Sequence, residues 1–187
     1  MKVIISHSIG EEILYCGGMM FQDQPTYIIY MALANIDEPY HATPDFLRNG
    51  IKNSSALLKF KYEIVFQGRQ FYDRLDSLPQ QKIETVLKKR IEFLNPTDIF
   101  IPTLNYNSSS NIINYAVKNM YHDAGINILE YGLSEGTYHY MLTTEAMRRK
   151  KNALSSFGDL LPHTRIDIQE YYNIYRVYNE VPGIRKE

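Results

Sequence analysis

The sequence contains a single cysteine, Cys16, among 187 residues. One thiol excludes an intrachain disulfide framework and a zinc cluster built on several thiolates, and it is typical of a protein from the reducing cytoplasm. Neither sign of charge dominates, because 20 Lys and Arg stand against 21 Asp and Glu, for a formal net charge of −1. Without a positive field over the whole molecule, nucleic acid is not an expected partner.

Long apolar runs are also missing. No stretch approaches the ~20 residues that a membrane-spanning helix requires, so no membrane span is expected. The N-terminus turns polar at Ser6 and lacks the charged-then-apolar layout of a signal peptide. There is no internal repeat and no linker rich in Gly, Ser or Pro. We therefore expect a single soluble, cytoplasmic domain over residues 1–187.

Short runs of β-branched or aromatic residues alternate with longer amphipathic stretches. This alternation is typical of parallel strands joined by crossover helices. The predicted strands are residues 2–6, 26–32, 62–67, 98–103 and 127–131. The sequence therefore predicts an α/β fold with a mostly parallel sheet.

Helices are predicted between these strands. Their expected starts are near Glu11, at Asp45 as a cap, near Leu78, at Ser109 or Ser110, and at Thr143 or Thr144. Residues 166–177 have a spacing that fits both a helix and a strand, and we predict a final strand. The basic run at residues 148–151 is predicted to form a solvated helix face rather than a binding site.

The loops after the predicted strands are where a ligand is expected, because open α/β sheets bind ligands beyond the carboxyl ends of their strands. The first loop offers the imidazole of His7 and the carboxylates of Glu11 and Glu12 beside a helix N-terminus. These groups suit a bound cation or proton transfer. The alternative interpretation is a capped helix with two solvated glutamates and a loop histidine.

The fourth loop, residues 103–111, is rich in neutral donors and acceptors ahead of a helix. Such a loop suits sugar hydroxyls, or an anion at the positive end of the helix. Ser and Asn are also ordinary turn and cap residues, so the loop is compatible with a purely structural role.

Five segments carry a family resemblance, in order along nearly the whole chain: residues 3–18, 71–75, 95–99, 150–157 and 173–177. Together they resemble the PIG-L/LmbE family. The first resembles the family's opening strand, its His-Pro-Asp-Asp-Glu motif and a Gly-Cys-Gly-Gly stretch. This family comprises Rossmann-like, usually zinc-dependent N-deacetylases of N-acetylglucosamine conjugates and related amides. The resemblance implies a single Rossmann-like three-layer domain with an LmbE-like fold.

The first loop departs from the family's motif at most of its functional positions. In the register set by Cys16, the family's first zinc-ligand His falls on Ser8, its general-base Asp on Gly10 and its second ligand Asp on Glu11. Glu12 matches the family's Glu. A serine hydroxyl is a poor zinc ligand and a glycine is no base.

The fourth loop departs in the same way. The family's Tyr-x-His-Pro-Asp-His pattern falls on residues starting at Tyr106, which places its catalytic His on Ser108 and its third zinc ligand on Asn111. Asp73 lies in the segment that resembles the family's aspartate-containing loop. Zinc is the cofactor that the resemblance implies, but most ligand positions are substituted, so the cofactor is left unknown.

Two functions remain open, and a scaffold subunit is a third possibility. The one we favour acts on or binds an N-acetylated amino sugar or a related glycosyl or nucleotide-sugar ligand, with the usual zinc deacetylase site largely replaced. Its expected ligand-binding residues are His7, Ser8, Asp73, Tyr106, Ser108 and Asn111. The alternative is an active metal-dependent N-deacetylase, with His7 and Glu11 holding the metal and Glu12 activating water. Either function has a small sugar or amide as its partner; the oligomeric state is not predicted.

Overall fold

The computed structural model describes residues 1–23, 25–34, 42–67, 75, 78–104, 108–122, 125–132, 136–158, 169–176 and 184–186. In these residues the strands are β1 (Lys2–Ser8), β2 (Thr26–Ala34), β3 (Lys61–Phe66), β4 (Asp98–Pro102), β5 (Asn127–Tyr131), β6 (Tyr138–Met141), β7 (Gln169–Arg176) and β8 (Ile184–Lys186). The helices are α1 (Glu11–Gln22), α2 (Pro44–Leu58), α3 (Gln80–Leu94), α4 (Ser108–Tyr121) and α5 (Thr144–Ser155).

All eight strands form one sheet in the order β3-β2-β1-β4-β5-β7-β6-β8. The first five pair in parallel, with β1 between β2 and β4. The last three add antiparallel pairings, β7 with β5 and with β6, and β8 with β6. The predicted α/β fold is therefore confirmed, with an antiparallel extension on one side of a parallel sheet.

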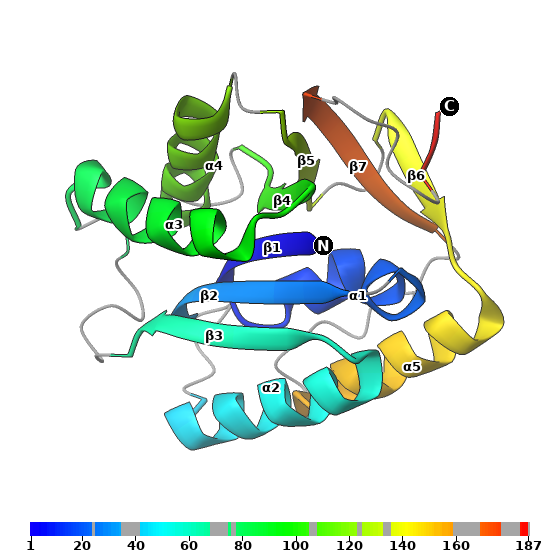
Figure 1. The fold of residues 1–187 in the computed structure, drawn as a ribbon. Helices are drawn as coiled ribbons and strands as arrows, with labels where there is room; N and C mark the ends of the chain where they lie inside the picture. Colours follow the sequence, from blue (N-terminus) through cyan, green and yellow to red (C-terminus); the bar gives the residue numbers. More distant parts are fainter. Residues whose placement is uncertain are drawn as a thin grey trace.

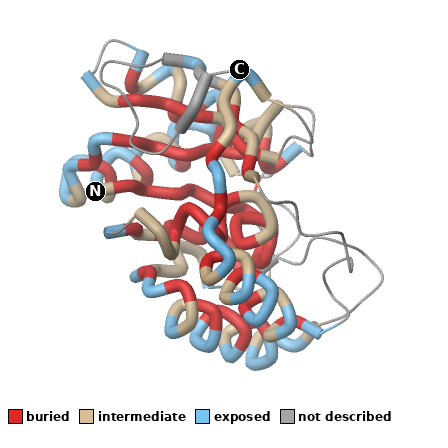
Figure 2. Tube along the Cα trace, turned by 90° about the vertical axis from the view of Figure 1, so that its right-hand side faces the viewer, coloured by how far each residue is buried: buried red, intermediate tan, exposed pale blue. Residues whose placement is uncertain are grey.

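Helices cover both faces of the sheet, which gives three layers (Figure 1). Alternate strand residues point to opposite faces. Ile4 and Phe100 belong to the core under α1, α2 and α5, whereas Ile5 and Ile101 belong to the core under α3 and α4. Figure 2 shows the buried residues running along the strands between exposed outer helix turns. Burial on both faces explains why the parallel strands have continuous apolar runs.

Two helix starts show how local sequence sets the boundaries. The Thr43 hydroxyl accepts the N–H of Phe46 at 3.3 Å and caps α2, while Pro44 occupies the first turn. The prediction that Asp45 caps this helix is wrong, because the fixed φ of Pro44 already fits a helical residue and moves the cap back to Thr43. Thr143 caps α5, which confirms one of the two predicted alternatives.

The C-terminal part of the sheet was only partly predicted. Residues 169–176 form the predicted strand, but this strand is not the final one, because β8 follows it. Neither β6 nor β8 was predicted. They have four and three residues, too short for a periodic pattern, and they are held by pairing with each other and with β7.

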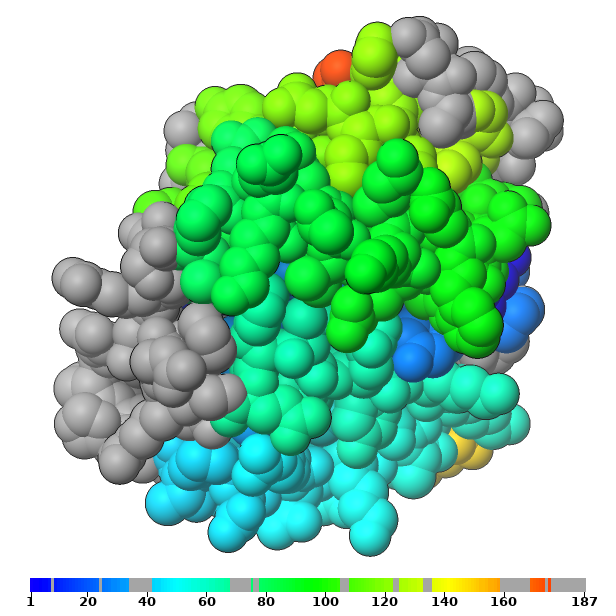
Figure 3. All heavy atoms as spheres, turned by 60° about the vertical axis from the view of Figure 1, so that its left-hand side comes forward, coloured from blue at the N-terminus to red at the C-terminus, as the bar shows by residue number. Residues whose placement is uncertain are grey.

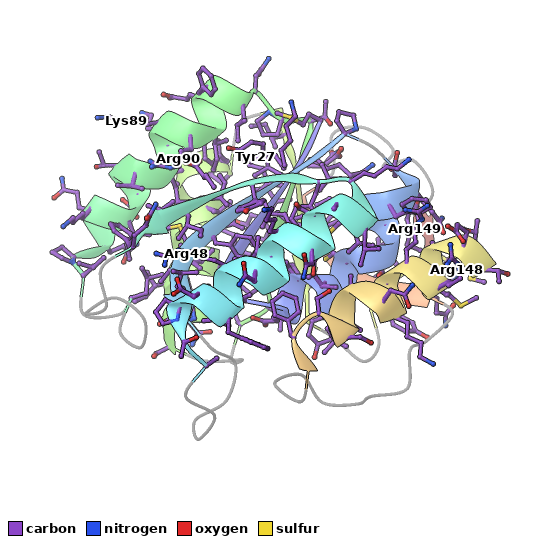
Figure 4. The ribbon with its side chains drawn as sticks, turned by 90° about the horizontal axis from the view of Figure 1, so that it is seen from below. Tyr27, Arg48, Lys89, Arg90, Arg148 and Arg149 are labelled. Atoms are coloured by element: carbon purple, nitrogen blue, oxygen red, sulfur yellow. The ribbon has the colours of Figure 1, made fainter. Side chains whose placement is uncertain are left out.

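The basic run of α5 is not uniformly solvated. The Lys150 Nζ lies 2.7 Å from the Glu170 carboxylate of β7, and both side chains are buried. Arg149 donates to the Leu57 carbonyl oxygen of α2 at 3.1 Å, and Arg148 pairs with Glu145 on the surface (Figure 4). The predicted solvated face is therefore wrong for Lys150, because an ion pair with Glu170 compensates its burial.

The outer parallel strand β3 comes to the surface between α2 and α3 (Figure 3). Its first residue is exposed and the rest are half-buried, and Glu63 pairs with Arg90 of α3 at 3.0 Å. Charged residues on an edge strand discourage pairing with other chains. Among the described residues no helix is long and apolar enough to span a bilayer.

Candidate functional site

The strands β1 and β4 separate at their carboxyl ends. β1 stays paired with β2 as far as Ser8, but its ladder with β4 ends at Ile4 and Phe100. The chain then enters α1 on one face of the sheet after β1, and α4 on the other face after β4. This is a topological switch point, where open α/β sheets form their ligand crevice. The first and fourth loops thus leave adjoining strands at one edge of the sheet.

Tyr131, the last residue of β5, reaches across this separation. Its hydroxyl donates to the Ile5 carbonyl oxygen of β1 at 3.0 Å, and its ring is fully buried. On the far side, Asn114 of α4 donates to the Pro102 carbonyl oxygen of β4 at 2.8 Å. Side chains from β5 and α4 therefore satisfy carbonyl groups at the strand ends and fix the backbone on both sides of the switch point.

Glu12 is held in place by three donors. The Tyr30 hydroxyl lies 2.6 Å from its Oε1, and the Gly10 N–H and Ser6 hydroxyl lie 3.0 and 3.4 Å from its Oε2. Gly10 has a φ of 95°, in the left-handed region that favours glycine. Burial raises the pKa of Glu12 to about 7, although the three hydrogen bonds favour its charged form.

Glu11 is as deeply buried as Glu12 but differs in its partners. Neither of its carboxylate oxygens has a hydrogen-bond partner in the part of the chain that the structure describes. Burial, followed by the charge of Glu12, raises the pKa of Glu11 to about 8. A Cβ placed on Gly132 would lie 4.0 Å from the Glu11 Oε1 and 3.5 Å from the Thr103 Cγ2. The Glu11 carboxyl therefore faces the ends of β4 and β5.

Tyr15 and Tyr131 lie beside Glu11. Tyr15 is four residues beyond Glu11 on α1, which places both side chains on one face of the helix. The ring centroids of the two tyrosines are 6.4 Å apart. Burial raises the pKa of each hydroxyl, and the charge of Glu11 raises it further. The switch point thus carries one buried carboxyl group beside two aromatic rings.

The structure describes the other two predicted residues of the first loop to different extents. His7 is buried in β1. It lies at an irregularity in the β1–β2 pairing, because Ser6 pairs with Tyr30 but Ser8 pairs with Ala34, so β2 has two more residues than β1 over this stretch. Ser8 ends β1, and its side chain lies outside the description.

Of the four predicted residues beyond the first loop, the structure describes two. Ser108 and Asn111 both lie in the first turn of α4, the first exposed and the second half-buried. Asp73 and Tyr106 lie outside the described residues.

Sequence reasoning missed Tyr15, Tyr30 and Tyr131. Tyr15 carried a usable signal, because its spacing of four residues from Glu11 puts the two on one helix face. Tyr30 is aligned with Ser6 only through the β1–β2 register, and Tyr131 reaches Ile5 only through the strand order. Neither contact is visible in the sequence alone.

The described residues do not fit the zinc site that the resemblance implies. A protein zinc site takes about three protein ligands from His, Cys, Asp or Glu. No group of three such side chains gathers in the described ranges. Of the aligned positions, Glu11 carries unpartnered oxygens, Gly10 has no side chain, and Ser108 and Asn111 supply neutral oxygens.

Comparison with solved structures shows that the chain has the three-layer α/β fold of PIG-L/LmbE-like deacetylases. The conserved protein TT1542 from Thermus thermophilus superposes with a TM-score of 0.73 and 13% identity over 98% of both chains. The antimicrobial A40926 pseudoaglycone deacetylase Dbv21 superposes at 0.66 with 14% identity, over 83% of this chain and 80% of that one.

The same fold also serves another reaction. GalB, a 4-carboxy-2-hydroxymuconate hydratase from Pseudomonas putida, superposes at 0.67 with 11% identity, over 97% of this chain and all of that one. No protein-family model and no curated protein sequence matches the chain. The resemblance is therefore confirmed for the fold, and the reaction has to be argued from the site.

Proposed function

We propose that this protein acts on or binds an N-acetylated amino sugar, or a related glycosyl or nucleotide-sugar ligand, and does so without the zinc site of its deacetylase neighbours. The observation that carries the proposal is the Glu11 carboxyl, which is buried at the switch point without a described partner. Leaving a buried polar group unpaired costs about 1–3 kcal/mol. A ligand that donates the missing hydrogen bonds to Glu11 would offset this cost.

The chemistry of Glu11 suits an acylamino group. A ligand amide N–H can donate to one carboxyl oxygen. Because the pKa of Glu11 is raised to about 8, the group carries a proton at neutral pH and can donate it to the acyl oxygen. The two hydrogen bonds together recognise the amide, and the walls formed by Tyr15 and Tyr131 suit the apolar face of a sugar ring. The deacetylases that share the fold support this ligand class.

Ligand-induced stabilisation of the folded protein tests the proposal. Thermal melting is measured with N-acetylglucosamine and with UDP-N-acetylglucosamine, each in the presence of a chelator. A bound ligand raises the melting temperature according to its concentration relative to its Kd. We expect a shift for the unmodified protein and for the control Glu92→Gln, whose carboxylate is exposed on α3.

Glu11→Met is the variant that removes the recognition. It keeps similar volume but presents no polar atom, so the ligand-dependent shift is expected to disappear. If the unmodified protein shows no shift with any member of the panel, the proposal is wrong. If Glu11→Met responds as strongly as the unmodified protein, the ligand binds somewhere other than this crevice.

The alternative is a metal-dependent N-deacetylase that uses His7, Glu11 and Glu12. The observation that favours it is the same pair of unpartnered Glu11 oxygens, which also suit a divalent cation. The Glu12 oxygens already accept three hydrogen bonds, which leaves about one acceptor site for the water that a base would activate. Metal analysis of the purified protein and assays of amide hydrolysis with added zinc decide the matter. Retained metal together with Glu11-dependent hydrolysis would replace our proposal.

A further inference from the structure

The surroundings of Glu11 indicate which nitrogen group the crevice prefers. We propose that Glu11 binds a primary ammonium group, so that the crevice takes an amino sugar with a free amine in preference to its N-acetylated form. This inference rests on the proposed function in one respect, that the ligand is an amino-sugar derivative. It goes further by naming the group that lies against the carboxyl.

The charges around Glu11 favour a cation. No cationic side chain in the described ranges forms an ion pair with Glu11, and its charged neighbour along the helix is the buried carboxyl of Glu12. Two adjoining acidic groups withdrawn from water repel each other when both are ionised. Glu11 is protonated at neutral pH in the unliganded protein, and an adjacent ammonium group favours its ionised form. The ammonium group then offsets the repulsion and donates charge-assisted hydrogen bonds to the Glu11 oxygens.

The aromatic walls favour the same group. Tyr15 and Tyr131 lie with their ring centroids 6.4 Å apart and their planes inclined by 31°. The negative face of an aromatic ring attracts an ammonium ion, and the attraction is greatest where water is excluded. Tyr131 is fully buried and fixed by its bond to Ile5, while Tyr15 is half-buried on the solvent side. A carboxyl group beside two such rings is a suitable environment for an organic cation.

The Glu11 Oε1 atom is directed toward Gly132, which follows β5. A Cβ built on Gly132 would lie 4.0 Å from this oxygen and 3.5 Å from the Thr103 Cγ2. The glycine therefore leaves the approach to Glu11 Oε1 free of a side chain from position 132.

The test compares glucosamine with N-acetylglucosamine, and adds methylammonium as a probe without a sugar. Affinities are measured at neutral pH by titration calorimetry or NMR shifts, with a chelator in every sample. We expect the unmodified protein to bind glucosamine about tenfold more tightly than N-acetylglucosamine, since hydrogen bonds to a charged group are stronger. The control Glu92→Gln should keep this preference.

Glu11→Gln separates charge from hydrogen bonding. The carboxamide can still pair with an acetamide, so N-acetylglucosamine affinity should change little, while glucosamine should bind about tenfold more weakly. Circular dichroism and a melting curve verify that the variant is folded. Tyr15→Leu is the second variant, and removing one ring from the solvent side should weaken glucosamine more than N-acetylglucosamine.

The outcomes are distinguishable. If N-acetylglucosamine binds as tightly as glucosamine, or if Glu11→Gln keeps the preference for the amine, the ammonium inference is wrong and the proposed function survives. If neither sugar binds but methylammonium binds in a Glu11-dependent way, the proposed function is wrong and the inference survives. If none of the three probes binds the unmodified protein, both fail.

Discussion

Glu11, the first residue of α1, and Glu170 of β7, which contacts α1, both have buried carboxyl groups, but the two differ in their hydrogen-bond partners. The Glu170 oxygens accept the N–H groups of Gly18 and Met19 at 2.7 and 2.9 Å and the Lys150 Nζ at 2.7 Å. The Glu11 oxygens accept no hydrogen bond in the described part of the chain. A buried carboxylate that serves the fold is fully partnered. The comparison therefore supports the proposal that the Glu11 oxygens are available to a ligand.

The partners of Glu170 show what it does for the fold. The N–H groups of Gly18 and Met19 lie in the middle of α1, where a regular helix directs them to carbonyl oxygens four residues earlier. The Tyr172 hydroxyl donates to one of those carbonyls, the Tyr15 oxygen, at 3.3 Å. Side chains of β7 thus enter the hydrogen-bond ladder of α1 and join the helix to the sheet.

The largest effect is expected from breaking the partnered site. Lys150→Met leaves the Glu170 charge buried without its cation, which should lower the free energy of unfolding by about 3–5 kcal/mol. Urea unfolding measures the difference. The matched control Lys151→Met changes an exposed residue of the same helix and should stay within about 0.5 kcal/mol. A loss below about 1 kcal/mol for Lys150→Met would mean that the backbone donors alone compensate Glu170.

The unpartnered site should respond with the opposite sign. Glu11→Met removes a buried polar group that has no described partner, so the free energy of unfolding should rise by about 1–3 kcal/mol near pH 8. The same urea experiment measures the gain. The same variant should no longer bind the ligand. A gain in stability together with a loss of binding would show that Glu11 serves ligand binding at the expense of stability. A destabilised variant would show that Glu11 supports the fold as Glu170 does.

Filling the space beside Glu11 should have a smaller effect on stability. Gly132 has a φ of +93°, so Gly132→Ala should cost about 1–2 kcal/mol in backbone strain. Its methyl group would also lie 4.0 Å from the Glu11 Oε1 and hinder a ligand at this oxygen, so glucosamine should bind more weakly. Gly125→Ala is the control, because a Cβ at Gly125 meets no atom within 4 Å. Unchanged glucosamine affinity in Gly132→Ala would place the amine elsewhere.

A pH titration of stability sharpens the comparison without altering the chain. Folding raises the pKa values of Glu11 and Glu12 from 4.5 to about 8 and about 7. The folded state then binds protons more tightly than the unfolded state, so the contribution of these groups is complete below about pH 4.5 and is lost as the pH rises to about 8. Urea unfolding between about pH 5 and 9 should show this decline, and Glu11→Met should reduce it. An identical slope in the variant would assign the decline to other groups.

The sequence allowed the sheet to be predicted because hydrophobic periodicity is a local property. The strands at residues 98–102 and 127–131 follow from apolar runs between turn residues. The three-residue strand β8 has no pattern of its own and exists through its partner β6. Lys150 illustrates the same limit, because its burial depends on Glu170, 20 residues further along the chain.

The candidate site was predictable in its location but not in its division of roles. Glu11 and Glu12 are neighbours with identical side chains, and the sequence favours neither. One residue of helix turns the side chain by about 100°, which directs Glu12 to Tyr30 and Gly10, and Glu11 to Gly132. Their different roles therefore depend on the strand order, which brings β2 to one side and β5 to the other.

The insertion of β7 side chains into α1 also has a consequence for biosynthesis. The donors on Gly18 and Met19 and their acceptor on Glu170 are separated by 152 and 151 residues. When the ribosome has released the first helix, the residues up to β7 are still to be made, and contacts of such long range close late. The first helix can thus complete its packing only after β7 has been synthesised. Until then the face of α1 that β7 covers stays exposed in the nascent chain.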